Sequence, residues 1–200
     1  ASTPDRFLTY GTYEVVEKGS SQGYKVTIQG NGEVVIRDDG ASYGYSGYKI
    51  NAGDNNVYEP VIRGGVKIQK RDYESKAKST LGAGSFEGIS FEIINQSANP
   101  VIVDGKSYKT GNVVKTIVTD KNGLATTASN TLPYGTYKIR EKNAPTGYLK
   151  EGITERTFTI RENGKIVDMT PVNVSIQDQV VRGDFALRKI DSETQRTMAY

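Results

Sequence analysis

Short runs in which apolar and polar residues alternate make up most of this chain. Alternation with a period of two predicts β-strands, and no segment repeats its apolar residues at the 3.6-residue spacing of an amphipathic helix. Turn signals separate the runs, and residues 30–32 (GNG) and 162–164 (ENG) have the composition of hairpin turns. The pattern therefore predicts an all-β chain, built as a sandwich of short antiparallel strands.

One run is unusual because it ends on a charge that points inward. Residues 66–72 read VKIQKRD. Successive side chains of a strand point to opposite faces, so Val66 and Ile68 share their face with Lys70. The pattern thus places a lysine where a core residue is expected.

Two further runs end in the same way. Residues 137–141 (YKIRE) place Glu141 on the apolar face, and residues 172–178 (VNVSIQD) do the same for Asp178. A lone buried charge costs several kcal/mol, so such groups are expected to be paired or chemically removed. The alternative is that these groups and Lys70 reach solvent at strand ends, where an ion pair contributes little.

The chain also repeats itself. Residues 8–18 read LTYGTYEVVEK, and residues 132–142 read LPYGTYKIREK. In the same way, residues 59–72 (EPVIRGGVKIQKRD) are similar to residues 178–191 (DQVVRGDFALRKID). Similarity at a long and nearly constant spacing indicates tandem copies of one domain.

The repeats predict how the chain is divided. Residues 1–63 are expected to be the C-terminal part of a preceding β-sandwich repeat, residues 64–183 a complete domain, and residues 184–200 the first strand of the next repeat. Lys189 is the inward lysine of that next strand, and Glu17 is the glutamate of the preceding repeat. The expected fold is a row of immunoglobulin-like β-sandwich domains, in a piece of a longer array.

Composition excludes several kinds of function. The chain contains no cysteine and no histidine, which rules out disulfides, the usual zinc sites and histidine-dependent nucleophiles. The net charge of +3 is too small to indicate a nucleic acid as partner. No apolar run is long enough to cross a bilayer, and the acidic clusters lack the spacing of a calcium loop, so neither membrane insertion nor a metal or cofactor is expected.

Several segments resemble a known family. They are the opening strand with Lys70 in IQKRD, residues 135–148 (GTYKIREKNAPTGY) and residues 174–183 (VSIQDQVVRG). Within the second segment, the pattern Glu-x-x-Ala-Pro-x-Gly-Tyr is specific. Residues 64–183 are thereby similar to the collagen-adhesin B-type, or SpaA-like, domains of Gram-positive surface proteins and pilins.

The resemblance implies a prealbumin-like (transthyretin-like) β-sandwich with an intramolecular isopeptide bond between its first and last strands. By motif, the bonded residues are Lys70 and Asp178, and Glu141 assists as a proton relay. In the first partial repeat, Glu59 stands at the position of the bonding aspartate, unless a shift of register brings in residues 55–56. Whether that repeat forms its own bond is left open.

The resemblance also implies a function. Domains of this family serve as pilus shafts or as stalk modules of adhesins, so an extracellular, cell wall-anchored protein is expected, with neighbouring repeats of the same chain as partners. Because the bond forms once, by reaction of the domain with itself, the chain is not expected to be an enzyme. A glycosidase is disfavoured in particular, because nothing spaces two carboxylates across a cleft.

A second function stays open at this point. The tyrosine-rich residues 43–48, or the polar loop of residues 73–80, could make this a β-sandwich that binds carbohydrate or host matrix. Host matrix proteins or glycans could equally be bound by other domains of the same protein.

Overall fold

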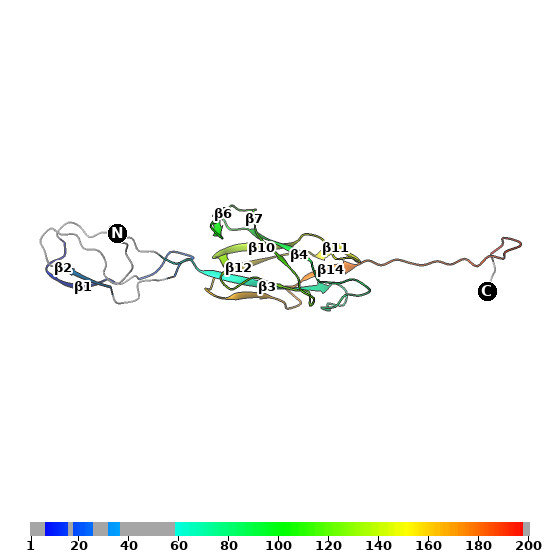
Figure 1. Ribbon diagram of the computed structural model, residues 1–200, viewed down its shortest axis with the longest axis horizontal. Helices are drawn as coiled ribbons and strands as arrows, with labels where there is room; N and C mark the ends of the chain where they lie inside the picture. The colour runs from blue at the N-terminus through cyan, green and yellow to red at the C-terminus, as the bar shows by residue number, and fades with distance from the viewer. Residues whose placement is uncertain (1–6, 16–17, 26–31, 37–58, 198–200) are drawn as a thin grey trace.

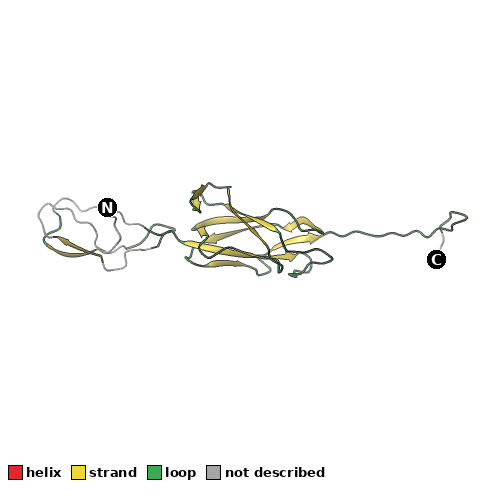
Figure 2. Cartoon of the chain, viewed as in Figure 1, coloured by secondary structure: helices red, strands yellow, loops and turns green. Residues whose placement is uncertain are grey.

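The computed structural model describes residues 7–15, 18–25, 32–36 and 59–197, and these form strands, turns and extended segments (Figure 2). Within these ranges no helix is long and apolar enough to cross a membrane. The predicted all-β architecture is confirmed. The strands are β1 (Gly11–Val15), β2 (Gly32–Ile36), β3 (Arg63–Asp72), β4 (Ser90–Asn95), β5 (Val101–Val103), β6 (Lys106–Tyr108), β7 (Val113–Val118), β8 (Leu124–Thr126), β9 (Leu132–Pro133), β10 (Gly135–Glu141), β11 (Tyr148–Ile153), β12 (Glu155–Ile160), β13 (Ile166–Met169) and β14 (Ile176–Val180).

Two sheets face each other in the central part of the molecule. The first has four antiparallel strands in the order β12-β10-β4-β7. The second has six strands: β11-β14-β3-β13 lie in that order, and β8 and β9 also pair with β3. Buried side chains of both sheets, such as Val66, Phe91 and Ile139, form one hydrophobic core. The chain enters this sandwich at one end through β3 and leaves it at the other end after β14 (Figure 1).

The second sheet is built on β3. This strand is 10 residues long, and it pairs in parallel with β13 and with the last strand, β14. Its pairs with β8 and β9 are antiparallel. The prediction of antiparallel strands is therefore wrong at β3, because local alternation carries no information on the direction of partners that follow much later in the chain.

The predicted hairpin at residues 162–164 is also corrected. The segment does form a turn, but β12 before it belongs to the four-stranded sheet, whereas β13 after it pairs with β3. The turn thus carries the chain from one sheet to the other. The hairpin signal at residues 30–32 lies mostly outside the described residues.

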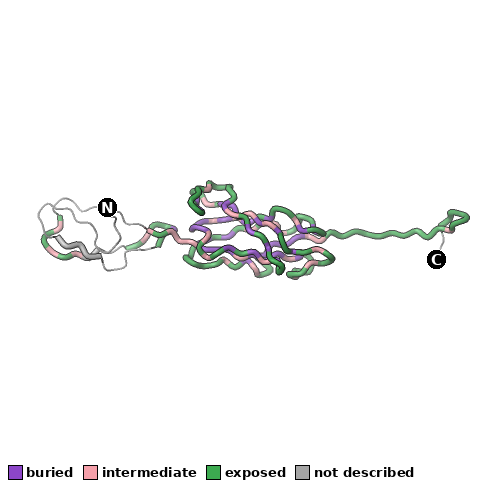
Figure 3. The backbone as a smooth tube through the Cα atoms, in the orientation of Figure 1, coloured by how far each residue is buried: buried purple, intermediate pink, exposed green. Residues whose placement is uncertain are grey.

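Burial follows the predicted alternation in β10. Tyr137 and Glu141 on one face of the strand are fully buried, whereas Arg140 on the opposite face is exposed. β3 is covered more completely, because Gln69 on the face opposite to Lys70 is buried as well. Buried residues accordingly gather where the two sheets face each other (Figure 3).

The closing strand begins later than predicted. It was expected over residues 172–178, but it begins at Ile176 and is preceded by a turn in which the Ser175 N–H donates to the Pro171 carbonyl at 2.9 Å. Proline has no N–H for a strand ladder and has a φ angle suited to turns, which explains the delay. Asp178 lies in the strand, as expected, and is fully buried.

A turn that follows β3 has a counterpart near the C-terminal end of the described chain. The carboxylate of Asp72 accepts hydrogen bonds from the N–H and the hydroxyl of Ser75, at 2.6 and 2.8 Å. That of Asp191 accepts from the N–H and the hydroxyl of Thr194 at the same distances. In both turns the next residue has a positive φ, 62° and 59°. The two turns share one local structure, at positions related by the sequence repeat.

Close packing along β3 predicts that Gly65 cannot be replaced by a residue with a side chain without loss of stability. A Cβ at this position would lie 2.5 Å from the carbonyl oxygen of Ala128 and 2.8 Å from the hydroxyl of Thr127. We expect Gly65→Ala to lower the free energy of unfolding by roughly 1–3 kcal/mol, the usual cost of overpacking. Gly183→Ala is the matched control, since nothing lies within 4 Å of the added atom. Equal denaturation midpoints for the two variants would contradict this packing.

Candidate functional site

Lys70, Glu141 and Asp178 meet inside the sandwich, and we refer to them as the lysine–carboxylate cluster. Lys70 on β3 and Asp178 on β14 belong to the six-stranded sheet, whereas Glu141 comes from β10 of the facing sheet. The Nζ atom of Lys70 lies 2.6 Å from Oδ1 of Asp178 and donates a hydrogen bond to Oε2 of Glu141 at 3.0 Å. All three side chains are 0% exposed. The cluster therefore links the two sheets in an interior that solvent does not reach.

Strand register explains why these residues converge. β14 lies parallel to β3 with Ile176 opposite Lys70, and Asp178 follows two residues later on the same face. Side chains in strands lean along the strand direction, so the long Lys70 side chain can reach the carboxylate. In the facing sheet, Glu141 is the last residue of β10 and is paired with Phe91. Both carboxylates thus approach the lysine from apolar surroundings.

The contact between Lys70 and Asp178 is short, but it is not aligned as a hydrogen bond. Both carboxylate oxygens of Asp178, and Oε1 of Glu141, are buried without a hydrogen-bond partner. Buried polar atoms are normally satisfied, and each one that is not costs about 1–3 kcal/mol or more. The geometry is that of an amine held against a carboxyl group, with bonding capacity left unused on the carboxyl side.

This arrangement sits in a recognisable domain. The SpaA family model, described as a prealbumin-like fold domain, matches residues 64–175, which are more than half of the chain. The chain belongs to the SpaA prealbumin-like family. The family resemblance predicted from the sequence is thereby confirmed, together with the β-sandwich fold.

Several solved structures are similar to this chain over much of its length. The Bacillus anthracis TIE protein is 24% identical with a TM-score of 0.58, over 87% of this chain and 26% of that one. GBS52, the minor pilin of Streptococcus agalactiae, is 20% identical with a TM-score of 0.43, over 92% of this chain and 66% of that one. BcpA, the major pilin subunit of Bacillus cereus, is 27% identical with a TM-score of 0.41, over 62% of this chain and 31% of that one. The chain thus spans between about a quarter and two thirds of the length of these proteins. No curated protein matches it.

Burial changes the acidity of Glu141 in this SpaA-type core. Removal from water raises the pKa of Glu141 to about 8, although the positive charge of Lys70 acts to lower it. The neighbouring Asp178 carboxyl raises the pKa further. Near neutral pH, Glu141 therefore carries a proton that it can donate or share.

Sequence reasoning missed a third buried carboxylate, which lies close to the cluster. Asp72 is also fully buried and lies on the same strand face as Lys70, two residues later. Burial raises its pKa, but hydrogen bonds from Ser75 and from the Tyr148 hydroxyl, the latter at 3.1 Å, outweigh burial and hold the pKa below its usual value. Asp72 is thus a satisfied, ionised structural residue. The alternation in VKIQKRD did contain this signal, because it places Asp72 inward as well.

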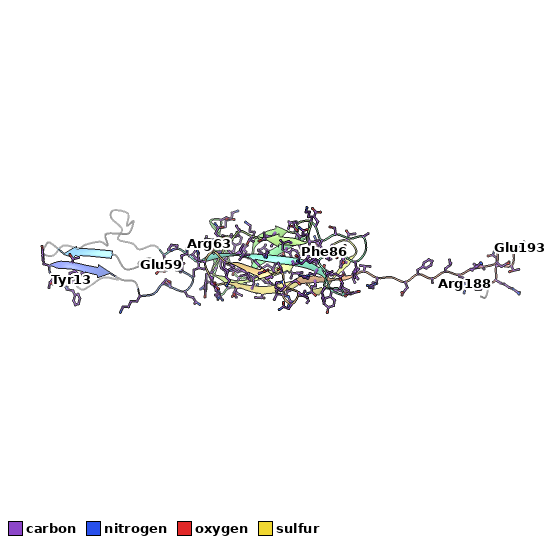
Figure 4. All side chains as sticks on the ribbon, turned by 90° about the horizontal axis from the view of Figure 1, so that it is seen from below. Tyr13, Glu59, Arg63, Phe86, Arg188 and Glu193 are labelled. Atoms are coloured by element: carbon purple, nitrogen blue, oxygen red, sulfur yellow. The ribbon has the colours of Figure 1, made fainter. Side chains whose placement is uncertain are left out.

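The other predicted site residues do not join the cluster. Lys189 is exposed, in an extended segment where Phe185 is 87% exposed. Figure 4 shows the side chains of this segment projecting from a single length of extended chain. Glu17 and residues 55–56 lie outside the described residues. Oε2 of Glu59 accepts a hydrogen bond from the backbone N–H of Ser21 at 3.4 Å.

The two alternative binding surfaces are only partly described by the structure. Residues 43–48 lie outside the described residues. In the loop of residues 73–80, the Tyr73 ring lies 3.9 Å from the ammonium of Lys76 and packs against Gly152, and Tyr73 remains 39% exposed. In the part of the chain that the structure describes, no group of three or more metal-ligating side chains could hold a metal ion.

The raised pKa of Glu141 predicts a dependence of stability on pH in a variant that lacks any crosslink. The folded state binds the Glu141 proton more tightly than the unfolded chain does. The protonated Glu141 therefore contributes its full stabilisation of the fold below pH 4.5, and this contribution is lost as the pH rises through about 8. In Lys70→Met, the positive charge that lowers the pKa of Glu141 is absent, so the folded-state pKa of Glu141 is higher than in the wild type. We expect the free energy of unfolding of Lys70→Met, measured in denaturant across this range, to fall as the pH rises.

The matched control is Lys70→Met combined with Glu141→Gln, which cannot ionise at this position. Its unfolding free energy should lack this decline. If the single and the double variant show the same pH dependence, Glu141 does not carry a raised pKa.

Proposed function

We propose that this domain is a stalk or shaft module of a Gram-positive cell-surface adhesin or pilin, stiffened by an autocatalytic isopeptide bond between Lys70 and Asp178. The observation that carries the proposal is the 2.6 Å approach of the lysine Nζ to the Asp178 carboxyl, with both side chains fully buried beside Glu141. Membership of the SpaA family supports the same reading. Extracellular, cell wall-anchored localisation and neighbouring repeats as partners follow as parts of this proposal.

The reaction begins with a proton transfer that the dry interior favours. When the Lys70 ammonium passes a proton to the Asp178 carboxylate, two buried charges become a neutral amine and a neutral carboxylic acid. The amine then has a lone pair available for attack on the carboxyl carbon of Asp178. Proximity of this kind can lower a barrier by roughly 7–11 kcal/mol in well-oriented systems.

Glu141 acts as the proton relay in this proposal. Its protonated carboxyl donates a hydrogen bond to the Asp178 carbonyl oxygen and polarises it as the new C–N bond forms. It then takes a proton from the attacking nitrogen and delivers one to the departing hydroxyl, so one water leaves and Glu141 is regenerated. The product is a neutral amide, and no charge is left on Lys70 or Asp178. One turnover on itself does not make the domain an enzyme.

The position of the bond suits a module that carries tension. The chain enters the sandwich at β3 and leaves it after β14, at opposite ends of the molecule (Figure 1). With Lys70 joined to Asp178, force passes along β3, across the amide and out through the end of β14. Residues 71–177 are then bypassed, and strand hydrogen bonds no longer resist the load. A crosslink that closes a loop of this length also adds roughly 4–5 kcal/mol to stability, by analogy with disulfides.

The intact mass of the purified chain tests the proposal. We expect the wild-type protein to be lighter than its sequence mass by one water, because amide formation releases one. Lys70→Ala, Asp178→Ala and Glu141→Ala should each have their full sequence mass. Lys67→Ala is the matched control: Lys67 lies on the same strand, is partly exposed and pairs with Asp168 at 3.5 Å, so the water should still be lost. A wild-type mass equal to the sequence mass would refute the bond.

A further inference from the structure

A turn that precedes the SpaA-type sandwich packs directly on one of its aromatic side chains. Gly23 has a φ of 92° and lies flat against the ring of Tyr134; a Cβ at this position would come within 3.0 Å of the ring. The side-chain amide of Gln22 donates a hydrogen bond to the Tyr134 hydroxyl at 2.8 Å. The Arg161 guanidinium lies 4.5 Å from the centre of the same ring. Tyr134 is therefore held by both the turn and the sandwich.

The chain that joins the two parts is fixed at the same place. Ile62 donates its N–H to the Gly23 carbonyl at 2.7 Å and accepts the N–H of Tyr134 at 2.8 Å. Lys25 donates its N–H to the Pro60 carbonyl at 3.0 Å. The connection, from Glu59 to Arg63, thus runs between the turn and Tyr134, and Figure 4 places these two residues where the chain approaches and enters the sandwich. Few backbone torsions are left free between the two parts.

The same turn recurs at the far end of the sandwich. Gly147, which stands at the position of Gly23 in the sequence repeat, has a φ of 83°, and its carbonyl accepts the Val181 N–H at 2.9 Å. Tyr148 donates its N–H to the Pro145 carbonyl at 3.0 Å, the distance found between Tyr24 and Ser21 in the first turn. Here, however, nothing lies within 4 Å of a Cβ added to Gly147. This turn has the shape of the first one but no ring against it.

The tyrosine side of the contact is also repeated. Tyr10 aligns with Tyr134 in the two LxYGTY segments and is 84% exposed. We propose that the positive-φ glycine turn and the tyrosine form a recurring joint, in which the turn of each module packs on the tyrosine of the following module and fixes their relative orientation. Gly23 and Tyr134 form one such joint in this chain, and the Gly147 turn is the surface for the tyrosine of a following module.

This inference extends the proposed stalk function, because rigid modules make a stiff rod only when the joints between them are also rigid. It does not depend on the isopeptide bond. Gly23→Ala and Gly147→Ala form a matched pair: both place a side chain at a positive φ in the same turn, but only Gly23→Ala drives a Cβ into a neighbouring ring. The difference between them isolates the contact with Tyr134.

The test uses the full chain, which has no native cysteine. Spin labels at Thr12→Cys and Lys121→Cys, both exposed positions, report the distance between the N-terminal part and the sandwich by pulsed electron paramagnetic resonance. Hydrogen exchange of the Ile62 amide reports the joint itself. We expect a narrow distance distribution and slow Ile62 exchange in wild type and in Gly147→Ala. Gly23→Ala should broaden the distribution and accelerate this exchange by about tenfold or more.

A broad distribution in wild type, or identical behaviour of the two variants, would overturn the joint. An unchanged melting transition of the sandwich in Gly23→Ala shows that the variant still folds. Repeating the measurement on Glu141→Gln, which should not form the amide, separates the two proposals, because the joint should persist there.

Discussion

A lysine buried between two carboxylates is the constraint around which this structure is arranged. Removing ions from water costs several kcal/mol each, and the mutual attraction of the charges recovers this only when geometry and hydrogen bonding are good. Here Asp178 has no aligned hydrogen bond, and Glu141 uses one of its two oxygens. The buried Lys70–Asp178 ion pair is thus poorly satisfied by hydrogen bonds, whereas the proposed amide between the two side chains would remove both charges.

The parallel pairing of β3 and β14 determines how a bond between Lys70 and Asp178 would transmit force. In a sandwich whose first and last strands lay in different sheets, a bond between them would still stabilise the fold but would carry load across the core. Here the two strands are neighbours in one sheet, with Lys70 opposite Ile176, so the proposed bond would continue the line of the backbone. Glu141 comes from the other sheet, where it would assist the proposed reaction without lying in the path of force. The proposed joint at Tyr134 would stiffen the connection to the neighbouring module, because packed and hydrogen-bonded contacts take the place of a free linker.

Alternation along the strands was enough to predict which side chains point inward, because a period of two is a local property of the backbone. This is why Lys70, Glu141 and Asp178 could be selected from the sequence, and why Asp72 could have been. Strand direction and partner choice depend on segments far apart in the chain, so the parallel pairs of β3 and the change of sheet at residues 162–164 were not predictable. The late start of β14 had a local cause in Pro171. It was not predicted, because Val172 and Val174 continue the alternating pattern of the strand toward the N-terminus. The packing of Gly23 on Tyr134 could not be predicted from the sequence, which shows only that this glycine and this tyrosine each recur in the repeat.

The central claim is a covalent bond between two specified side chains, and peptide mapping addresses it most directly. Trypsin should cut after Arg63, Lys67, Arg71, Lys165 and Arg182, but not after a Lys70 whose amine is acylated. We expect a branched peptide in which residues 68–71 are joined to residues 166–182, with tandem mass spectrometry placing the link at Lys70 and Asp178. Recovery of the two linear peptides at their unmodified masses, with cleavage after Lys70, would contradict it.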